Sequence, residues 1–316
     1  MAMRIDKFLY FLMAGIGFLL AGCNPNPKIT DSMVDSSARV RNPIIKTEAK
    51  LYRPEIKYHL DSLESAAAID SLFSSYSQDE LENILALNRI DKNRLRIGQK
   101  LIIPDCAASN FNSYSPFPQY LPEIACVPKS VLIAQRIQAF ALYENGYLLR
   151  WGPVSTGKGS TQTPSGLNYG NYKAKRKIST IDPSWIMPYY FNFMNKEGIG
   201  THEYSLPGYP ASHGCVRMRQ ADAKFIYDWA EMWQLEEGRI QKNGTPFIVF
   251  GKYDFSADKP WYDLASDMKA NDLNDTEIDS LREYLNSYQN DPRNFPNPEP
   301  GESLLASSAN DTISVN

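Results

Sequence analysis

The sequence predicts a mainly β protein, in which a small α+β region precedes a strand-rich region at residues 130–253. The pair Asn145-Gly146 lies between two strand-like apolar runs, and it indicates a tight hairpin because both turn residues need positive φ. The apolar run 246–250 indicates a final buried strand. Within residues 130–253, the segment 221–233 carries apolar side chains at helical spacing, so we expect one helix to pack on these strands.

The length and charge narrow the function classes. A chain of 316 residues exceeds one typical domain and predicts two compact units with tails. The net charge of −3 and the lack of a basic cluster argue against a nucleic-acid partner. Four cysteines are too few for a disulfide-scaffolded miniprotein. The three histidines, His59, His202 and His213, leave few candidates for acid–base chemistry, and we expect no cofactor, no metal and a monomer.

Residues 1–22 are predicted to be a signal peptide. Two basic residues, Arg4 and Lys7, precede an apolar run that is too short to span a bilayer. The run ends in Leu-Ala-Gly-Cys23, which resembles the bacterial lipobox. The resemblance implies that Cys23 is lipidated and that the protein is a membrane-anchored lipoprotein, periplasmic or at the cell surface. A plain secretory signal is the alternative. The polar residues 23–54 are expected to be a linker.

Residues 55–105 form the predicted α+β region. Ser77 and Glu80 have the spacing of a capping box ahead of an amphipathic helix. The segment 88–104, with Gly98-Gln99 and a short apolar run ending in Pro104, resembles the second half of a LysM repeat. That resemblance implies binding to the glycan strands of peptidoglycan, and a small helical spacer without a ligand is the alternative. His59 has no neighbouring metal-ligand type in the sequence, so we expect a solvated or core histidine.

Two further segments flank the strand-rich region, and the second of them, the tail, is expected to carry no chemistry. Residues 106–129 are predicted to be a linker in which Cys106 and Cys126 form a disulfide, worth roughly 3 kcal/mol in the chain-entropy model. Two free cysteines are the alternative. Residues 254–316 are predicted to be an acidic, largely disordered tail with one possible helix at 276–287.

The chemistry is predicted between residues 200 and 218, where two histidines accompany the remaining cysteine, Cys215. A thiol is a poor nucleophile at neutral pH unless a base or a cation activates it, and histidine supplies a base. His213 lies two residues before Cys215, so in an extended segment the two side chains share a face. Gly214 lies between them and permits a tight turn. The backbone N–H groups of Gly214 and Cys215 are candidate oxyanion donors.

These residues resemble the L,D-transpeptidase catalytic domain, the YkuD family. The resemblance is carried by His202 and by the run Ser212-His213-Gly214-Cys215-Val216-Arg217-Met218, and it extends over about 120 residues. It implies a YkuD-like β-sandwich for residues 130–253. Glu203 and Arg219 depart from the family pattern, but they remove no reacting group.

The resemblance implies a mechanism and a set of roles. Cys215 is the nucleophile that releases D-Ala from a peptidoglycan tetrapeptide stem, His202 is the general base, and His213 orients or polarises the thiolate. Arg217 holds a carboxylate or braces the loop. The expected substrate-binding residues are Ser212, Gly214, Arg217 and Tyr189. Tyr189 and Trp185 are candidates for the cleft wall, and packing in the core is an equal alternative.

Four further alternatives stay open at the level of sequence. His202, His213 and Cys215 form a possible Cys-His₂ zinc set. The protein is alternatively an inactive peptidoglycan-binding lipoprotein, although such a protein would be expected to have lost the cysteine or the histidines. Hydrolysis by an L,D-carboxypeptidase is the nearest rival to transfer. The acyl acceptor is a second stem, a D-amino acid or a wall-linked lipoprotein.

Overall fold

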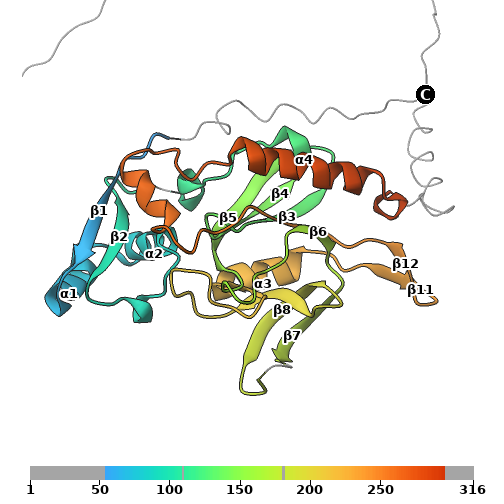
Figure 1. The fold of residues 1–316 in the computed structure, drawn as a ribbon, viewed down its shortest axis with the longest axis horizontal. Coiled ribbons are helices and arrows are strands. Elements are labelled where there is room, and N and C mark those ends of the chain that lie inside the picture. Colours follow the sequence, from blue (N-terminus) through green and yellow to red (C-terminus); the bar gives the residue numbers. More distant parts are fainter. Residues whose placement is uncertain (1–53, 109, 180–181, 296–316) are drawn as a thin grey trace, which may run out of the picture. The chain divides into compact units, whose positions relative to one another are not determined.

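The computed structural model describes residues 54–108, 110–179 and 182–295, all of which belong to one compact unit. The lipobox cysteine Cys23 and the predicted linker before residue 54 lie outside the described residues. The main element is a nine-stranded sheet in the order β6-β13-β3-β4-β5-β10-β9-β8-β7, so the predicted mainly β fold class is confirmed (Figure 1). Its strands are β3 (Lys129–Ala134), β4 (Ala139–Glu144), β5 (Tyr147–Ser155), β6 (Gly166–Tyr169), β7 (Tyr172–Ile178), β8 (Ile186–Met194), β9 (Ile199–Glu203), β10 (Val216–Met218) and β13 (Pro246–Phe250).

An N-terminal unit of strand, two helices and strand precedes the sheet. It comprises β1 (Tyr58–Leu63), α1 (Ala66–Ser75), α2 (Gln78–Leu87), the 3-10 turn η2 (Lys92–Arg94) and β2 (Gln99–Pro104). The predicted capping box begins α2, since the Ser77 side chain accepts from Glu80 N–H and the Glu80 carboxylate accepts from Ser77 N–H. β1 and β2 pair antiparallel, so the region has the α+β character that the sequence predicted.

The central hairpin forms where the Asn-Gly pair predicted it. Asn145 and Gly146 have φ of 48° and 81°, and β4 and β5 pair antiparallel on either side of them. A Cβ on Gly146 would lie 2.9 Å from the Tyr120 ring and 3.0 Å from Leu121 O, so both the turn and the close approach of residues 120–125 require glycine. This hairpin leads directly into β5, which pairs with β10 beside the candidate site.

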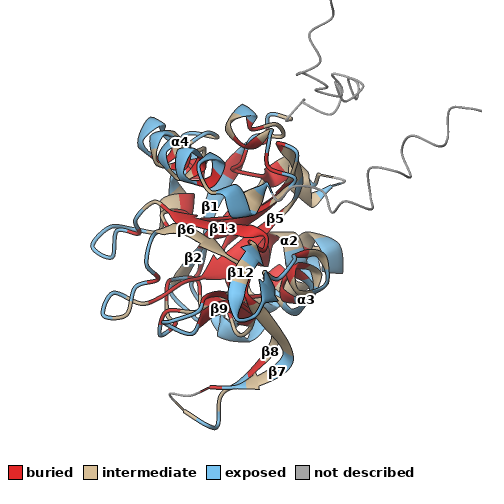
Figure 2. Cartoon of the chain, turned by 90° about the vertical axis from the view of Figure 1, so that its right-hand side faces the viewer, coloured by how far each residue is buried: buried red, intermediate tan, exposed pale blue. Residues whose placement is uncertain are grey.

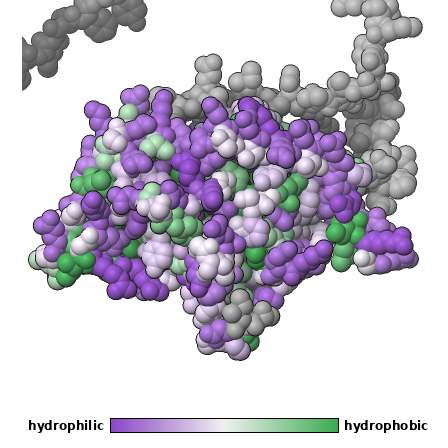
Figure 3. All heavy atoms as spheres, viewed as in Figure 1, coloured by the Kyte–Doolittle hydropathy of each residue, from purple (hydrophilic) through white to green (hydrophobic). Residues whose placement is uncertain are grey.

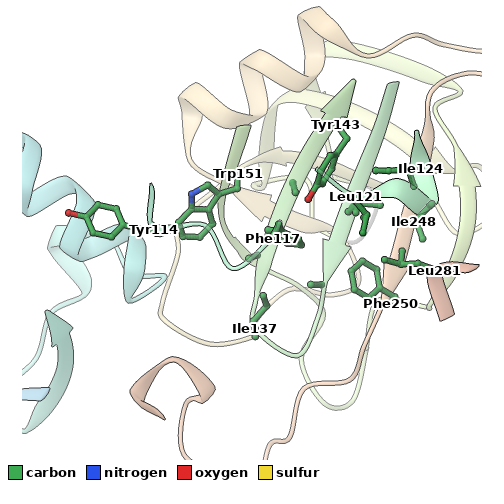
Figure 4. Packing of buried hydrophobic residues seen from close by; sticks show 14 of the residues in the cluster. Tyr114, Phe117, Leu121, Ile124, Ile137, Tyr143, Trp151, Ile248, Phe250 and Leu281 are labelled. Carbon is green, nitrogen blue, oxygen red and sulfur yellow. The ribbon is translucent and has the colours of Figure 1, made fainter. Parts of the chain in front are cut away.

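The central strands of the sheet are largely buried (Figure 2). Apolar clusters pack on both faces of the sheet, so these strands are apolar along most of their length. One cluster contains Tyr143, Trp151 and Phe250. It also includes residues from the chain segments that precede β3 and follow β13 in the sequence (Figure 4). The opposite cluster contains Phe140, Phe191 and Phe247 and the buried side of α3 (Gln220–Trp229).

The helix α3 is shorter than the sequence predicted. It ends at Trp229 because Ala230 is extended and Glu231 bonds to Thr245 through both its N–H and its carbonyl. Ile226 is buried, Phe225 and Trp229 pack on the same cluster, and Trp233 falls beyond the helix end. A small hairpin that the sequence did not predict follows, formed by β11 (Gln234–Glu236) and β12 (Arg239–Lys242).

The segment 106–129, predicted to be a disulfide-closed linker, differs from that expectation. Cys106 and Cys126 are free and exposed, so the disulfide prediction is wrong for this structure. The segment instead forms the 3-10 turns η3 (Phe111–Tyr114) and η4 (Pro122–Ile124). Its buried side chains are Tyr114, Phe117, Leu121, Ile124 and Val127. Burial of these side chains on the sheet fixes the segment without a covalent link (Figure 4).

Residues 254–295 of the predicted tail are ordered, in contrast to the predicted disorder. It contains η5 (Pro260–Ala265), α4 (Asp275–Gln289) and η6 (Pro292–Asn294). Asp275, Asp279 and Glu283 lie on the exposed side of α4, while Leu281, Leu285 and Tyr288 are buried. Figure 2 shows the exposed outer side of this helix. Glu277 is also buried, and it forms an ion pair of 2.9 Å with Arg136. The helix predicted at 276–287 is therefore present and packed.

No helix within the described ranges is both long and apolar enough to cross a membrane. The face shown in Figure 3 is mostly hydrophilic, with only scattered apolar spots.

Candidate active site

The parallel pairing of β9 and β10 brings the predicted residues together. His202 is the register partner of Arg217, so the two side chains lie on one face of the sheet. Cys215 precedes Val216 at the start of β10, and alternation places its side chain on the same face as Arg217. These residues line one pocket, formed by Ser179, Trp185, Met187, His202, Tyr204, Ser212, His213, Cys215 and Arg217.

The loop that presents Cys215 is held by hydroxyl groups. Ser212 Oγ accepts from Gly214 N–H at 3.0 Å and donates to the carbonyl of Cys215. Thr163 Oγ1 donates to Gly214 O at 2.7 Å and accepts from Gly157 N–H at 3.0 Å. Gly214 N–H is thus already bonded, and of the two predicted oxyanion donors only Cys215 N–H is left for that role.

Gly214 itself has no substitute in this loop. Its φ is +117°, which side chains of L-residues rarely adopt, and a Cβ at this position would lie 3.3 Å from Ile199 Cδ1. The glycine of the motif therefore follows from the backbone turn that directs Cys215 into the pocket.

His202 is buried, with 4% of its surface exposed, and it lies in a defined tautomer. Its Nδ1 is 2.8 Å from the carbonyl oxygen of Glu203, and because a carbonyl only accepts, Nδ1 carries the proton. The other nitrogen, Nε2, is then a free base. Burial lowers the pKa of His202 to about 4, while the Glu203 carbonyl raises the pKa and the charge of Arg217 lowers it further.

Cys215 is partly exposed in the pocket, and its Sγ lies 3.9 Å from Gly198 O. Burial raises the pKa of the thiol above its ordinary value. A hydrogen bond from the Gly200 backbone and the positive charges of Arg217 and Lys177 oppose that shift only in part. The resting site at neutral pH is therefore a protonated thiol with a neutral imidazole. In this state His202 is a base that can take the thiol proton during the reaction, and the sulfur is not held as a thiolate beforehand.

His213 lies at the mouth of the pocket and is exposed. Its Nε2 is 3.2 Å from Lys158 Nζ, and since an ammonium group only donates, Nε2 is the acceptor. Its ring centroid lies 4.9 Å from that of Trp185, with the ring planes inclined by 40°. This arrangement makes His213 a positioning or binding group, because its Nε2 is already engaged by Lys158.

Positive charge dominates the pocket. Arg217 lies over the Tyr204 ring at 4.6 Å, and Lys177 lies over the Tyr190 ring at 5.3 Å. Lys158 adds a third cation at His213. None of the lining side chains is a carboxylate. The site is therefore suited to an anionic ligand, such as a molecule with free carboxylates.

Tyr189 is the predicted binding residue that the structure does not bring to the pocket. Its ring packs edge-on against Tyr227, with centroids 5.9 Å apart, and joins the cluster beneath α3. Met187 and Tyr190 face the site although they are three residues apart. In a regular strand, residues three apart point to opposite faces. Tyr189, between them, has a positive φ of 50°, which breaks the alternation of β8. Trp185, the other candidate for the cleft wall, does line the pocket.

Sequence reasoning missed Ser179 and Tyr204, whereas it placed Met187 and Tyr190 in a segment, 187–193, that resembles the cleft lining of the YkuD family. Tyr190 OH donates to Gly198 O at 2.6 Å, the same carbonyl that Cys215 Sγ approaches. Burial and the neighbouring Cys215 raise the pKa of Tyr190, so the phenol stays protonated and able to donate. No sequence signal marks Ser179 or Tyr204, because their place at the pocket depends on which strands become neighbours.

The zinc alternative finds no support in this geometry. Within residues 54–108, 110–179 and 182–295, no three His, Cys, Asp or Glu side chains gather as a metal site requires. His202 Nδ1 is bonded to a carbonyl, and the Lys158 ammonium occupies His213 Nε2, where it would repel a metal cation.

The comparison with protein families matches this region. Residues 129–249 match the family model of YkuD, the L,D-transpeptidase catalytic domain. The nine-stranded sheet and its cysteine–histidine pocket thus belong to a YkuD domain, which was the resemblance predicted from the sequence. The match covers less than half of the chain. A comparison with curated protein sequences found no match.

Solved structures similar to the chain include an L,D-transpeptidase from Stackebrandtia nassauensis, with 25% identity and a TM-score of 0.33 over 40% of this chain and 57% of that one. An L,D-transpeptidase from Mycobacterium smegmatis has 21% identity and a TM-score of 0.32, over 39% of this chain and 59% of that one. A C442S mutant of the Enterococcus faecium enzyme has 20% identity and a TM-score of 0.30, over 39% and 50%. The chain spans less than two thirds of each of these structures.

Proposed function

We propose that the protein is an L,D-transpeptidase that acts on the tetrapeptide stems of peptidoglycan through a thioester on Cys215. The observation that carries the proposal is the pocket in which a partly exposed thiol shares one sheet face with a buried, neutral histidine. The family match at residues 129–249 supports the same reaction class. The absence of carboxylates from the lining and the surrounding cations suit a substrate that carries free carboxylates.

In the first half-reaction, Cys215 Sγ attacks the carbonyl carbon between the third residue, a diamino acid, and the fourth, D-Ala. The thiol proton passes to His202 Nε2 as the S–C bond forms. The C–N bond then breaks, the D-Ala amine takes the proton from His202, and a thioester remains. In the second half-reaction an amine from another stem attacks the thioester carbon and gives a proton to His202. The C–S bond breaks as the new C–N amide bond forms, and His202 returns the proton to the sulfur.

The pKa values of His202 and Cys215 determine whether the proton moves before the attack or together with it. The imidazole pKa of about 4 makes His202 a weak base, and burial holds the pKa of Cys215 high. A preformed thiolate–imidazolium pair is therefore disfavoured, and proton transfer accompanies the attack. Cys215 N–H is the nearby donor left for the developing oxyanion, because Tyr190 OH already donates to Gly198 O.

Arg217 fits the role of carboxylate recognition better than the role of loop brace. Its guanidinium lines the pocket over Tyr204, and no carboxylate of the chain lines that pocket. The buried acid Asp222 is instead neutralised by Arg150 and Arg219. Arg217 is thus the group most available to bind a stem-peptide carboxylate.

The proposal extends to the N-terminal part of the chain. The strand–helix–helix–strand unit carries a groove lined by Phe73, Asp91, Lys92 and Asn93, with Lys92 Nζ 4.2 Å from the Phe73 ring. The half-buried Phe73 ring and the polar side chains beside it are candidate contacts for a sugar, in keeping with the LysM-like role in glycan binding. We further propose that lipid on Cys23 anchors the enzyme outside the cytoplasm.

The test is incubation of the protein without its predicted signal peptide and Cys23 (residues 24–316) with disaccharide-tetrapeptide. The products are followed by mass spectrometry. Loss of D-Ala with formation of a cross-linked dimer is the expected result. Loss of D-Ala without a dimer would favour the L,D-carboxypeptidase. Equal D-Ala release by wild type and Cys215→Ala would refute the assignment of the nucleophile.

A further inference from the structure

The loop between β9 and β10 is held by the N-terminal unit. Leu206 N–H donates to Asp91 Oδ2 at 2.8 Å, and Asp91 N–H donates to Leu206 O at 2.9 Å, so both peptide groups of Leu206 are bonded to one residue. Leu206 is buried, and Ile90 forms a bridge with Pro207 beside it. These contacts join segments more than 100 residues apart in the sequence.

A second contact to this loop comes from Arg94 in the 3-10 turn η2, which directly follows Asp91. Arg94 Nε donates to Ser205 Oγ at 2.9 Å. The Arg94 charge also lies close enough to Arg217 to oppose its protonation, although burial is the larger cause of the lowered pKa of Arg217. The N-terminal unit therefore adds a cation near the pocket as well as a support for the loop.

Both ends of the loop between β9 and β10 contribute residues to the pocket lining. It begins at Tyr204, whose ring faces the Arg217 guanidinium, and it ends at Ser212, which holds the Cys215 turn. Tyr204 N–H bonds to Met218 O at 3.1 Å, which fixes the start of the loop to β10. Between these fixed ends, Ser205 and Leu206 depend on Arg94 and Asp91 for their side-chain and backbone partners.

The segment that provides these contacts is itself anchored. Arg89 is buried, donates from Nε to Ile137 O at 3.0 Å, and lies over the Trp261 ring at 4.7 Å. Asn88 bonds on both sides of its amide, to Ile102 N–H and to Ile102 O, at 2.8 Å each. The segment 88–94 is therefore rigid enough to fix the position of the loop that it contacts.

We propose that Asp91 and Arg94 are positioning residues of the active site, which hold the Tyr204–Leu206 part of the loop so that Tyr204 and Arg217 together form the carboxylate-binding wall. The proposal rests on the proposed function for its activity readout. It makes the N-terminal unit a structural part of the substrate pocket, in addition to any separate role in glycan binding.

The test compares Asp91→Ala with Asp91→Asn, which keeps an acceptor oxygen for Leu206 N–H. The control is Asp70→Ala, an exposed acid on α1 of the same unit. In the full-length protein we expect Asp91→Ala to raise KM for the tetrapeptide about tenfold while kcat changes less than about twofold. Asp91→Asn should recover most of that loss, and Asp70→Ala should behave like the wild type.

Amide hydrogen exchange gives a second readout that needs no catalysis. Asp91→Ala should speed exchange of the amides at 204–208 and leave β13 unchanged. Unchanged exchange in the loop would overturn the positioning role, whether or not the protein proves to be a transpeptidase. Faster exchange with an unchanged KM would overturn the link to substrate binding. A wild type that releases no D-Ala would instead count against the proposed function.

Discussion

The buried neutral state of His202 has a measurable cost at low pH. Burial lowers the pKa of His202 from 6.5 to about 4. Above pH 6.5 the imidazole is neutral in both the folded and the unfolded chain, and this group adds nothing to the pH dependence of stability. Between pH 6.5 and 4 the unfolded chain binds a proton that the folded chain refuses, so the free energy of unfolding falls as the pH falls.

The size of the effect follows from the two pKa values. For a fall from pH 7.5 to pH 5, the linkage relation gives a loss of about 2 kcal/mol from this one histidine. The limit at still lower pH is about 3 kcal/mol, which corresponds to the full difference between the two pKa values. Most of the effect is thus accessible at pH 5, before the bulk of the carboxylates is protonated.

The assay is urea unfolding of the wild type and His202→Gln at both pH values. Glutamine cannot titrate, and its amide can still donate to Glu203 O. We expect the wild type to lose about 2 kcal/mol more than the variant between pH 7.5 and pH 5. Thr201→Val is the control, because it alters the buried neighbour on β9 without changing a titrating group. If the wild type and His202→Gln lose stability equally, His202 is not buried in the neutral form and the account of the base is wrong.

Three other predictions concern the same pocket. Gly214→Ala should lower the rate of Cys215 acylation by a carbapenem more than tenfold, because alanine is strained at φ +117° beside Ile199; a rate equal to the wild type would contradict this reading of the turn. Thr163→Val should leave Gly157 N–H and Gly214 O without their partner and lower the same rate about tenfold at unchanged secondary structure by circular dichroism. Arg217→Met should raise KM for the tetrapeptide and leave alkylation of Cys215 by neutral iodoacetamide within about threefold of the wild type, whereas a brace of the loop would change both rates together.

Some of the fold was open to prediction because local chemistry decides it. The Asn145-Gly146 turn needs only its own two residues to adopt positive φ, and the Ser77–Glu80 capping box closes within one helical turn. Cys215, His202 and His213 were predictable as a set because a thiol nucleophile needs a base. In each case the residues that decide the structure are near one another in the sequence or linked by the reaction.

The remainder depended on long-range packing. The tail looked disordered from its acidic composition, but Leu281, Leu285 and Tyr288 form a single buried stripe on α4. Tyr189 was a candidate for the pocket, but a left-handed φ turns its ring away from it. That backbone conformation leaves no mark in the sequence, so it could not be predicted. Tyr204 was missed because only the pairing of β9 with β10 places it over Arg217.

The central claim is that Cys215 accepts an acyl group with His202 as the base. The most direct measurement is the intact mass of the protein during incubation with disaccharide-tetrapeptide, trapped with acid and digested to locate the adduct. The account predicts a thioester on Cys215 that carries the stem without its D-Ala, and much slower formation of that species in His202→Gln. An adduct on another residue, or equal rates of formation in the two proteins, would contradict it.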